Sequence, residues 1–344
     1  MTPALHRRQL LLGAASLASP ALVRAQSASA RVVVVGGGFG GATVARYLRA
    51  WAPQVEVTLV EPATRFITCP FSNHVLAGLR SWDSISHGFD GLRAAGVRVV
   101  HALAEDVHGP QRSVRLHTGQ VLPWDRLVLS PGVDMRWGAL EGYDETAAEL
   151  APHAWKAGPQ TLLLRRQLQA MPDSGVFVMV IPDNPFRCPP GPYERASLVA
   201  HYLRQHKPRS KLLLLDAKNN FSKKELFLQG WKALYGGMVE WVSIAQDGQV
   251  VRVDAQAREV ETAFGARHRA DVLNVIPPQK AGLIAERAGV VDASGWAPVR
   301  GEDFASQQVA GIHVLGDAAL AGPIPKSGFA ANNQGKVVAA ALAA

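Results

Sequence analysis

Three glycines, Gly36, Gly38 and Gly41, have the spacing of the fingerprint with which many proteins bind a dinucleotide. In that fingerprint one glycine makes a tight turn, one lets a pyrophosphate approach the backbone, and one allows a helix to pack against a strand. Glu61 lies twenty positions after Gly41, where a carboxylate can bind ribose hydroxyls. The residue types and their spacing therefore predict a dinucleotide site.

The flanking sequence predicts the elements that would position these residues. The apolar run 32–35 directly precedes the glycines and a second run, 55–60, directly precedes Glu61, so both indicate strands. Between them we expect a helix, whose free N–H groups and positive dipole end would face the phosphates. Phe39, inside the glycine turn, belongs to the predicted cofactor site.

The chain also has two cysteines. They could form one structural disulfide, but their surroundings favour a different role. Cys69 follows Glu61 closely, where the chain should run from the adenosine end of the cofactor toward its reactive ring. Cys188 lies in the proline-rich loop 184–192 beside Arg187, which is expected to lower the pKa of the Cys188 thiol.

The loop 184–192 follows a strand expected at 175–181 and stands where a second glycine fingerprint would be. Proline has no backbone N–H, so the loop is badly suited to bind phosphates, and a second dinucleotide such as NADH is disfavoured. The surrounding sequence still predicts a separate α/β unit. Its other strands are expected at 211–216, 238–243, 250–254 and 271–276, and its helices at 154–170, 193–206 and 223–235.

Toward the C-terminal end, an apolar strand ends in Gly316 and Asp317. In FAD enzymes of this layout an aspartate at this position hydrogen-bonds the ribityl chain; the alternative is a common Gly-Asp turn. Lys326 and Ser327 then open a helix expected at 329–343. The helix dipole and the Lys326 charge would stabilise negative charge on a reduced flavin ring, unless Lys326 is a solvated loop lysine.

Together these patterns predict an α/β protein with two Rossmann-like dinucleotide-binding-type domains, in the layout of the disulfide reductases that bind FAD and NAD(P). Residues 31–150 and 278–344 are expected to form an FAD-binding domain in two parts. Residues 151–277 are expected to form the second domain, which lacks a nucleotide fingerprint.

Residues 1–25 resemble a twin-arginine export signal, with Arg7 and Arg8, a short apolar stretch and a small residue at a cleavage point. Leu10 stands where phenylalanine is usual, so an ordinary secretory signal is the alternative. Both interpretations predict an exported, periplasmic protein.

Composition argues against several other classes of protein. The 344 residues carry a net charge of +8, which falls to +5 when Arg7, Arg8 and Arg24 leave with the signal. There is no basic run, so nucleic acid is not an expected partner. No internal stretch is long enough for an integral membrane segment, and no metal site is expected.

Nearly the whole chain resembles one known family, the flavoprotein subunit of flavocytochrome c sulfide dehydrogenase. The most specific stretch is Pro-Phe-Arg-Cys-Pro-Pro-Gly-Pro-Tyr-Glu-Arg at 185–195, which generic flavoproteins have no reason to share. The other matching stretches are 35–41, the segment around Cys69, 152–158 and 326–332.

The resemblance implies an enzyme that oxidises sulfide to sulfur or polysulfide with FAD. It implies that Cys69 carries the FAD through a thioether, and that Cys188, the predicted catalytic residue, is half of a redox-active disulfide beside the flavin. Electrons would pass to a c-type cytochrome subunit. The family's second redox cysteine lies in a C-terminal domain that this sequence is expected to lack, so a truncated protein or an incomplete active site is expected.

Two other functions remain open from the sequence. A sulfide:quinone oxidoreductase shares the layout but works at a membrane through a C-terminal amphipathic segment. A non-catalytic FAD-binding subunit would only support a cytochrome. A disulfide between Cys69 and Cys188 would restore a two-cysteine mechanism but leave the flavin non-covalent.

Overall fold

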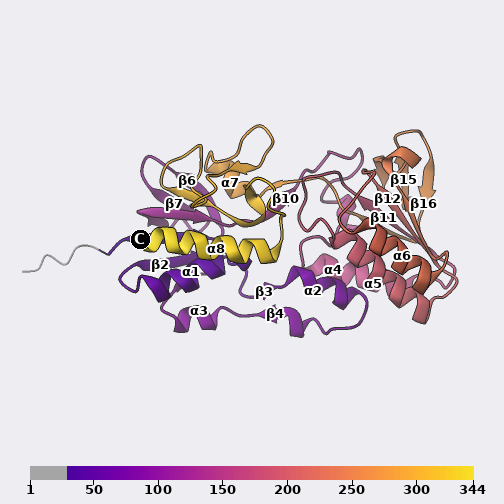
Figure 1. Ribbon diagram of the computed structural model, residues 1–344, viewed down its shortest axis with the longest axis horizontal. Coiled ribbons are helices and arrows are strands. Elements are labelled where there is room, and N and C mark those ends of the chain that lie inside the picture. Colours follow the sequence, from indigo (N-terminus) through magenta and orange to yellow (C-terminus); the bar gives the residue numbers. More distant parts are fainter. Residues whose placement is uncertain (1–28) are drawn as a thin grey trace, which may run out of the picture.

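The computed structural model describes residues 29–344. The export signal predicted at 1–25 lies outside the described residues. Figure 1 shows the N-terminal and C-terminal parts of the described chain together at one end of the molecule. The part around α5 (Gly191–His206), α6 (Lys224–Tyr235) and β12 (Lys211–Asp216) lies at the other end.

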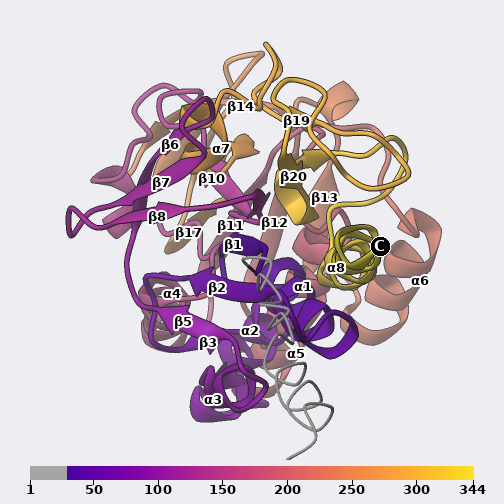
Figure 2. The same cartoon turned by 90° about the vertical axis from the view of Figure 1, so that its left-hand side faces the viewer.

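The first end contains a five-stranded parallel sheet in the order β20-β9-β1-β2-β5. Its strands are β1 (Arg31–Val35), β2 (Glu56–Val60), β5 (Arg98–Val100), β9 (Arg126–Leu129) and β20 (Ile312–Val314). The strands β20, β1, β2 and β5 are labelled in Figure 2. The carboxyl ends of β1 and β20 lie at one edge of this sheet, so Gly36 and Gly316 begin their loops at the same edge.

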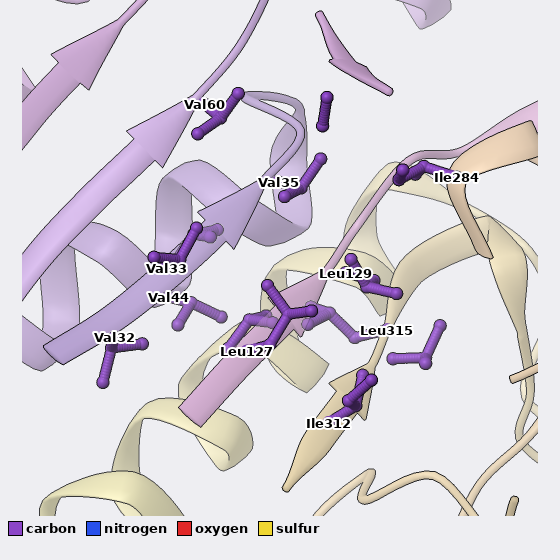
Figure 3. Close-up of a cluster of buried hydrophobic side chains, with 14 of the residues drawn as sticks. Val32, Val33, Val35, Val44, Val60, Leu127, Leu129, Ile284, Ile312 and Leu315 are labelled. Atoms are coloured by element: carbon purple, nitrogen blue, oxygen red, sulfur yellow. The ribbon is translucent and has the colours of Figure 1, made fainter. Parts of the chain in front are cut away.

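The strands of this sheet are runs of β-branched and leucine side chains, which favour a pleated, buried surface. Val32, Val33 and Val35 of β1 pack with side chains of the neighbouring strands and of helix α1 (Phe39–Trp51) (Figure 3). Burial of each such side chain stabilises the fold by roughly 1.5–3 kcal/mol.

Two long helices pack together against this sheet: α1 (Phe39–Trp51) and α8 (Gly328–Ala343) lie side by side (Figure 1). Small residues let the two backbones approach, since a methyl group at Gly335 would lie 2.8 Å from the carbonyl oxygen of Gly40. The Asn332 amide donates a hydrogen bond to the Thr43 hydroxyl at 2.8 Å. Both helix N-termini are thereby held near the carboxyl edge of the sheet.

The second unit has a four-stranded parallel sheet in the order β13-β12-β11-β17. Its strands are β11 (Val176–Ile181), β12 (Lys211–Asp216), β13 (Val239–Val242) and β17 (Val272–Val275). Its helices are α4 (Pro159–Ala170), α5 (Gly191–His206) and α6 (Lys224–Tyr235).

Smaller elements complete the fold. The short helices are α2 (Cys69–Leu76), α3 (Asp90–Ala94) and α7 (Leu283–Arg287). The remaining strands pair as β3 (Phe66–Ile67) with β4 (Ser86–His87); β6 (Ala104–His108), β7 (Ser113–Leu116) and β8 (Val121–Pro123); β10 (Val133–Met135) with β18 (Gln279–Ala281); β14 (Val250–Asp254), β15 (Glu259–Thr262) and β16 (Arg267–Arg269); and β19 (Ala297–Pro298) with β21 (Ala319–Leu320).

One predicted helix boundary is wrong. The helix expected from residue 154 begins at Pro159; residues 153–155 belong to no regular element, and residues 156–158 form bends. Ala154 has φ +46°, in the left-handed region, and proline at the first helical position is a common helix start. The segment 153–158 is therefore free to line the cavity described below.

The predicted fold class is confirmed: two parallel sheets with helices on their faces form an α/β protein of the dinucleotide-binding type. No helix within residues 29–344 has both the length and the apolar character needed to cross a bilayer. In the same range, histidine, cysteine and acidic side chains form no group of three or more that could hold a metal ion.

Candidate functional site

A cavity of about 520 Å³ lies at the carboxyl edge of the first sheet and extends to the loop after β11. Its volume is typical of small-molecule and cofactor sites. It brings together nine of the predicted site residues: Gly36, Gly38, Phe39, Glu61, Cys69, Cys188, Gly316, Asp317 and Ser327. Two others, Gly41 and Lys326, lie behind the lining.

The three fingerprint glycines differ in what surrounds them. Gly36 has φ +100°, and a methyl group there would lie 2.2 Å from the Ser130 carbonyl oxygen. A methyl group at Gly41 would lie 1.9 Å from the Gly36 carbonyl oxygen, so both glycines are required by the fold itself. At Gly38 the nearest atom would be 3.8 Å away, on Phe66. Only Gly38 therefore keeps open space that a ligand could fill.

Glu61 lies between the strand edge and the glycine turn. Its carboxylate accepts the Gly37 N–H at 2.7 Å and the Ala63 N–H at 2.9 Å. Glu61 lines the cavity and each of its oxygens has a further lone pair, so the same side chain can hold the turn and accept hydroxyl donors from a ligand.

Gly316 and Asp317 follow β20 on the opposite side of the cavity. The Gly316 N–H donates to the Gln334 side chain of α8 at 2.7 Å. One carboxylate oxygen of Asp317, Oδ1, is buried and has no hydrogen-bond partner among the described residues. Burial raises the pKa of Asp317, against the opposing charges of Arg187 and Lys326. A buried, unpartnered acceptor on a cavity wall fits a ligand hydroxyl.

Cys69 is the first residue of α2, so its side chain projects at the helix start rather than from a loop. The thiol sulfur lies 3.6 Å from the Trp155 carbonyl oxygen, to which it can donate a weak hydrogen bond. Both Cys69 and Cys188 are free thiols, so the structure contains no disulfide between them.

Cys188 is held from both sides. Its N–H donates to the Lys326 carbonyl oxygen at 2.7 Å, and its own carbonyl oxygen accepts the Gly191 N–H at 2.7 Å. Its φ of +57° lies in the left-handed region, a strained conformation that concentrates at functional sites. A methyl group at Gly191 would lie 3.1 Å from the Cys188 sulfur, so glycine there leaves room for the thiol.

The expected lowering of the Cys188 pKa by Arg187 is wrong in its net effect. Burial raises the pKa of the Cys188 thiol to about 11, and the charge of Glu194 adds to the rise. Arg187 lowers it, but by less than burial raises it. The sequence shows that an arginine is adjacent, but it does not show how far the thiol is removed from water.

Lys326 and Ser327 act at the start of α8. The Lys326 ammonium donates to the carbonyl oxygens of Asp317 and Ala319, both at 2.8 Å, and lies 3.8 Å from the centre of the Trp296 ring. Burial lowers the pKa of Lys326 to about 8. The Ser327 hydroxyl caps the helix by accepting the Ala330 N–H at 3.1 Å.

Two residues that line the cavity, Trp155 and Arg195, were given no role from the sequence alone. The Trp155 carbonyl oxygen contacts the Cys69 thiol and also accepts a hydrogen bond from the Arg187 guanidinium. Arg195, on α5, is only 2% exposed and also lines the cavity. Trp155 and Arg195 lie in the stretches 152–158 and 185–195, which carry the family resemblance. That resemblance is the sequence signal that could have identified them.

The second unit has an acid at the strand end that corresponds to Glu61, but it is used internally. Asp216, at the end of β12, is fully buried. It accepts hydrogen bonds from the Tyr193 hydroxyl at 2.6 Å, the Trp241 indole at 2.9 Å and the Lys218 ammonium at 2.6 Å. Tyr193 stacks on Phe221 with ring centres 3.5 Å apart, so side chains fill the space beside the acid.

Two family comparisons match different parts of the chain. Residues 30–166 match the pyridine nucleotide-disulphide oxidoreductase family, and residues 161–277 match the central region of the sulfide dehydrogenase (flavocytochrome c) flavoprotein chain. A 45-residue stretch is 71% identical to the sulfide dehydrogenase (flavocytochrome c) flavoprotein chain of Chlorobaculum thiosulfatiphilum. That match covers 94% of the relative and 13% of this chain.

The chain belongs to this flavoprotein-chain family.

Other relatives of this flavoprotein chain are more distant. It is 21% identical to the mitochondrial sulfide:quinone oxidoreductase of Mus musculus, over 83% of this chain and 65% of the relative. It is 28% identical to a sulfide-quinone reductase of Aquifex aeolicus, over 50% of this chain and 38% of the relative. The chain thus spans about two thirds or less of these relatives.

Solved structures share the fold. The sulfide:quinone oxidoreductase of Aquifex aeolicus superposes with a TM-score of 0.76 at 19% identity, covering 91% of this chain and 76% of that one. Putidaredoxin reductase, in its complex with putidaredoxin, superposes with a TM-score of 0.72 at 22% identity, covering 92% and 76%. At these identities the likeness concerns the fold alone.

Proposed function

We propose that this chain is the FAD-binding, sulfide-oxidising subunit of a flavocytochrome c, which yields sulfur or polysulfide and passes electrons to a c-type cytochrome in the periplasm. The observation that carries this proposal is the placement of Cys188 in the same cavity as the dinucleotide fingerprint. The matching flavoprotein chain is named as part of a sulfide dehydrogenase, which supports the same substrate.

The cavity fits FAD by two independent observations. Gly38 leaves open space at the turn, and Asp317 Oδ1 is a buried acceptor without a hydrogen-bond donor among the described residues. Gly36, Gly38, Phe39, Glu61, Gly316, Asp317 and Ser327 would hold the cofactor, and Cys69 would bear it covalently. When bound, FAD supplies a two-electron acceptor that can be reoxidised in single-electron steps.

Gly41 and Lys326 would support the cofactor from behind the cavity wall. Gly41 lets α1 approach β1, because any side chain there would collide with the glycine turn. Lys326 fixes the backbone from Asp317 to Ala319 through its ammonium and holds Cys188 through its carbonyl oxygen. Its buried positive charge would favour negative charge on the ligand.

Cys188 would bind the sulfur of the substrate. With a pKa of about 11 the thiol stays protonated at neutral pH, so hydrosulfide rather than Cys188 is the better nucleophile. Joining hydrosulfide to the Cys188 thiol through a sulfur–sulfur bond releases two protons and two electrons, and the bound FAD would be the acceptor of those electrons. The strained, doubly anchored backbone would keep the Cys188 sulfur in place while that bond forms.

The second unit would bind no nucleotide. A ribose would need the Asp216 carboxylate, which is buried against Tyr193, Trp241 and Lys218. The loop before α5 carries prolines where phosphate-binding N–H groups would be needed. The unit would instead present Cys188 to the cavity.

The acceptor is tested with purified holoprotein and sulfide under anaerobic conditions. We expect sulfide to bleach the flavin, and c-type cytochrome to restore its colour faster than a soluble quinone does. Faster reoxidation by quinone would favour the alternative, a sulfide:quinone oxidoreductase, which the relatives from Mus musculus and Aquifex aeolicus support. No bleaching at all would support the non-catalytic FAD-binding subunit.

A further inference from the structure

Arg195 is a buried arginine that hydrogen-bonds only to neutral groups. Its Nε donates to the Asn73 side-chain oxygen at 2.9 Å, and Nη1 donates to the His153 carbonyl oxygen at 2.9 Å and to the Asn274 side-chain oxygen at 3.0 Å. Its Nη2 donates to the Ala154 carbonyl oxygen at 2.6 Å. A guanidinium has five N–H donors, so one N–H, on Nη2, remains for another partner.

The charge of Arg195 has no counter-ion in the described chain. No carboxylate of residues 29–344 lies within 4.0 Å of its guanidinium. The buried Lys218 differs, because its ammonium lies 2.6 Å from the Asp216 carboxylate. An unpaired buried charge is costly to a fold, and proteins normally pair it or place it where a ligand neutralises it.

Arg195 lines the cavity that contains both cysteines. A thiolate at Cys69 or at Cys188 would raise the pKa of Arg195, which shows that both sulfurs lie within its electrostatic reach. Burial lowers the pKa of Arg195 to about 9, so the guanidinium stays protonated at neutral pH. Arg187 adds a second cation to the same wall, and its guanidinium donates to the Trp155 carbonyl oxygen.

Among the described residues, no acid of the cavity lies within ion-pair distance of either arginine. Glu61 is engaged by two backbone N–H groups at the glycine turn, and the Glu194 side chain is exposed. Asp317 has a raised pKa because it is buried. Arg187 and Arg195 thus both remain without a paired carboxylate among the described residues, although the Glu194 charge opposes that of Arg187 at the Cys188 thiol.

We propose that Arg195 is the anion-binding residue of this cavity and that it holds sulfide as the hydrosulfide anion beside Cys188. The identification of the anion as hydrosulfide rests on the proposed function; the anion site itself rests on the buried, unpaired guanidinium. The neutral hydrogen sulfide molecule would gain nothing from this charge, so Arg195 would select the nucleophilic form of the substrate.

A purely structural role for Arg195 is the competing explanation. The side chain joins α2, the segment 153–158 and β17 through neutral hydrogen bonds, and it also stacks on the Trp155 ring at 4.9 Å. A substitution at Asn73 can separate the effect of the Arg195 charge from the effect of the Arg195 hydrogen bonds. Its side-chain oxygen accepts from Arg195, and no hydrogen bond in the described chain uses its amide as donor. Asn73→Asp therefore keeps an oxygen that accepts the Arg195 Nε–H and adds a negative charge beside the guanidinium.

The test measures the dissociation constant of thiocyanate, a redox-inert monovalent anion, by isothermal titration calorimetry on the purified protein. The variants are Arg195→Gln and Asn73→Asp. The control is Arg165→Gln, which removes a half-buried arginine that donates to the Val75 carbonyl oxygen but does not line the cavity. Melting temperature and cofactor content verify that each variant is folded.

We expect both variants to weaken thiocyanate binding about tenfold or more, as loss of a charged hydrogen bond does, while the control binds as the wild type. Unchanged binding in folded Asn73→Asp, or no saturable binding to the wild type, would overturn the proposal. If thiocyanate binds as expected but sulfide fails to bleach the flavin, the anion site stands and the proposed function fails.

Discussion

The backbone N–H of Cys188 lies 2.7 Å from the carbonyl oxygen of Lys326 and donates a hydrogen bond to it. This bond joins the loop after β11, in the second unit, to the segment that precedes α8, in the first. The cavity wall at Cys188 is therefore shared by two units that each have their own sheet and core. Because the contact is made by backbone atoms, the side chain of Cys188 can be changed without removing it.

Cys188→Ser should lower sulfide-dependent reduction of the flavin by roughly a hundredfold or more, because the oxygen cannot take up the sulfur of the substrate. The ratio of FAD to protein should stay at the wild-type value, since the bond to Lys326 survives. Stopped-flow absorbance measures the reduction. Wild-type rates in this variant would exclude Cys188 as the catalytic sulfur.

Cys69→Ser should separate cofactor retention from cofactor binding. We expect wild-type protein to stay yellow after acid precipitation, because the thioether survives unfolding, and Cys69→Ser to release its flavin into the supernatant. Flavin fluorescence of the denatured protein on a gel gives the same readout. Cys188→Ser is the matched control and should stay yellow; release of flavin from the wild type would refute the covalent link.

Alanine substitutions at two fingerprint glycines should have different effects. Gly41→Ala places a methyl group 1.9 Å from the Gly36 carbonyl oxygen and should lower the free energy of unfolding by roughly 3 kcal/mol. Gly38→Ala meets open space, so it should change the stability of the cofactor-free protein by no more than about 0.5 kcal/mol.

The same pair also tests where the cofactor lies. Gly38→Ala should weaken FAD binding despite its normal stability, because the methyl group enters the space that the glycine leaves open. Denaturant unfolding of apoprotein and FAD titration measure the two effects. Equal FAD affinity for Gly38→Ala and wild type would place the cofactor away from this turn.

The stability of the protein should fall on acidification because His153 is buried in its neutral form. Its pKa is lowered to about 3 by burial and by the nearby charges of Arg195, Lys156 and Arg187. Below the unfolded-state pKa of about 6.5 the unfolded chain binds a proton that the folded chain refuses, so stability is lost progressively between pH 6.5 and 3. His313, whose pKa burial also lowers, contributes with the same sign.

His153→Asn isolates this contribution. The amide oxygen of the introduced asparagine would replace the ring nitrogen Nδ1 that accepts the Trp155 N–H at 2.9 Å, but it does not titrate. We expect the loss of stability between about pH 7 and pH 4.5, from urea unfolding, to be roughly 2 kcal/mol smaller in the variant than in the wild type. An identical loss in both proteins would assign the acid sensitivity elsewhere.

Much of the fold could be predicted from local sequence. The glycine spacing required the turn between β1 and α1, and the alternation of apolar runs with helical segments predicted the second unit. The strands expected at 211–216 and 250–254 have those bounds in the structure, because both are short, mainly apolar runs, which favour strands over helices. The strands β15 and β16, which are short and rich in charged residues, were not predicted.

The sequence by itself determined which residue types are available for chemistry: a dinucleotide turn, Glu61, Asp317 and two cysteines. Only the tertiary structure decided their environment. Burial outweighs the lowering effect of Arg187 on the pKa of Cys188, and Arg195 is buried and charged without a counter-ion among the residues that the structure describes. The physical reason is that desolvation and pairing depend on groups distant in the chain, such as Asn73 and Asn274 around Arg195.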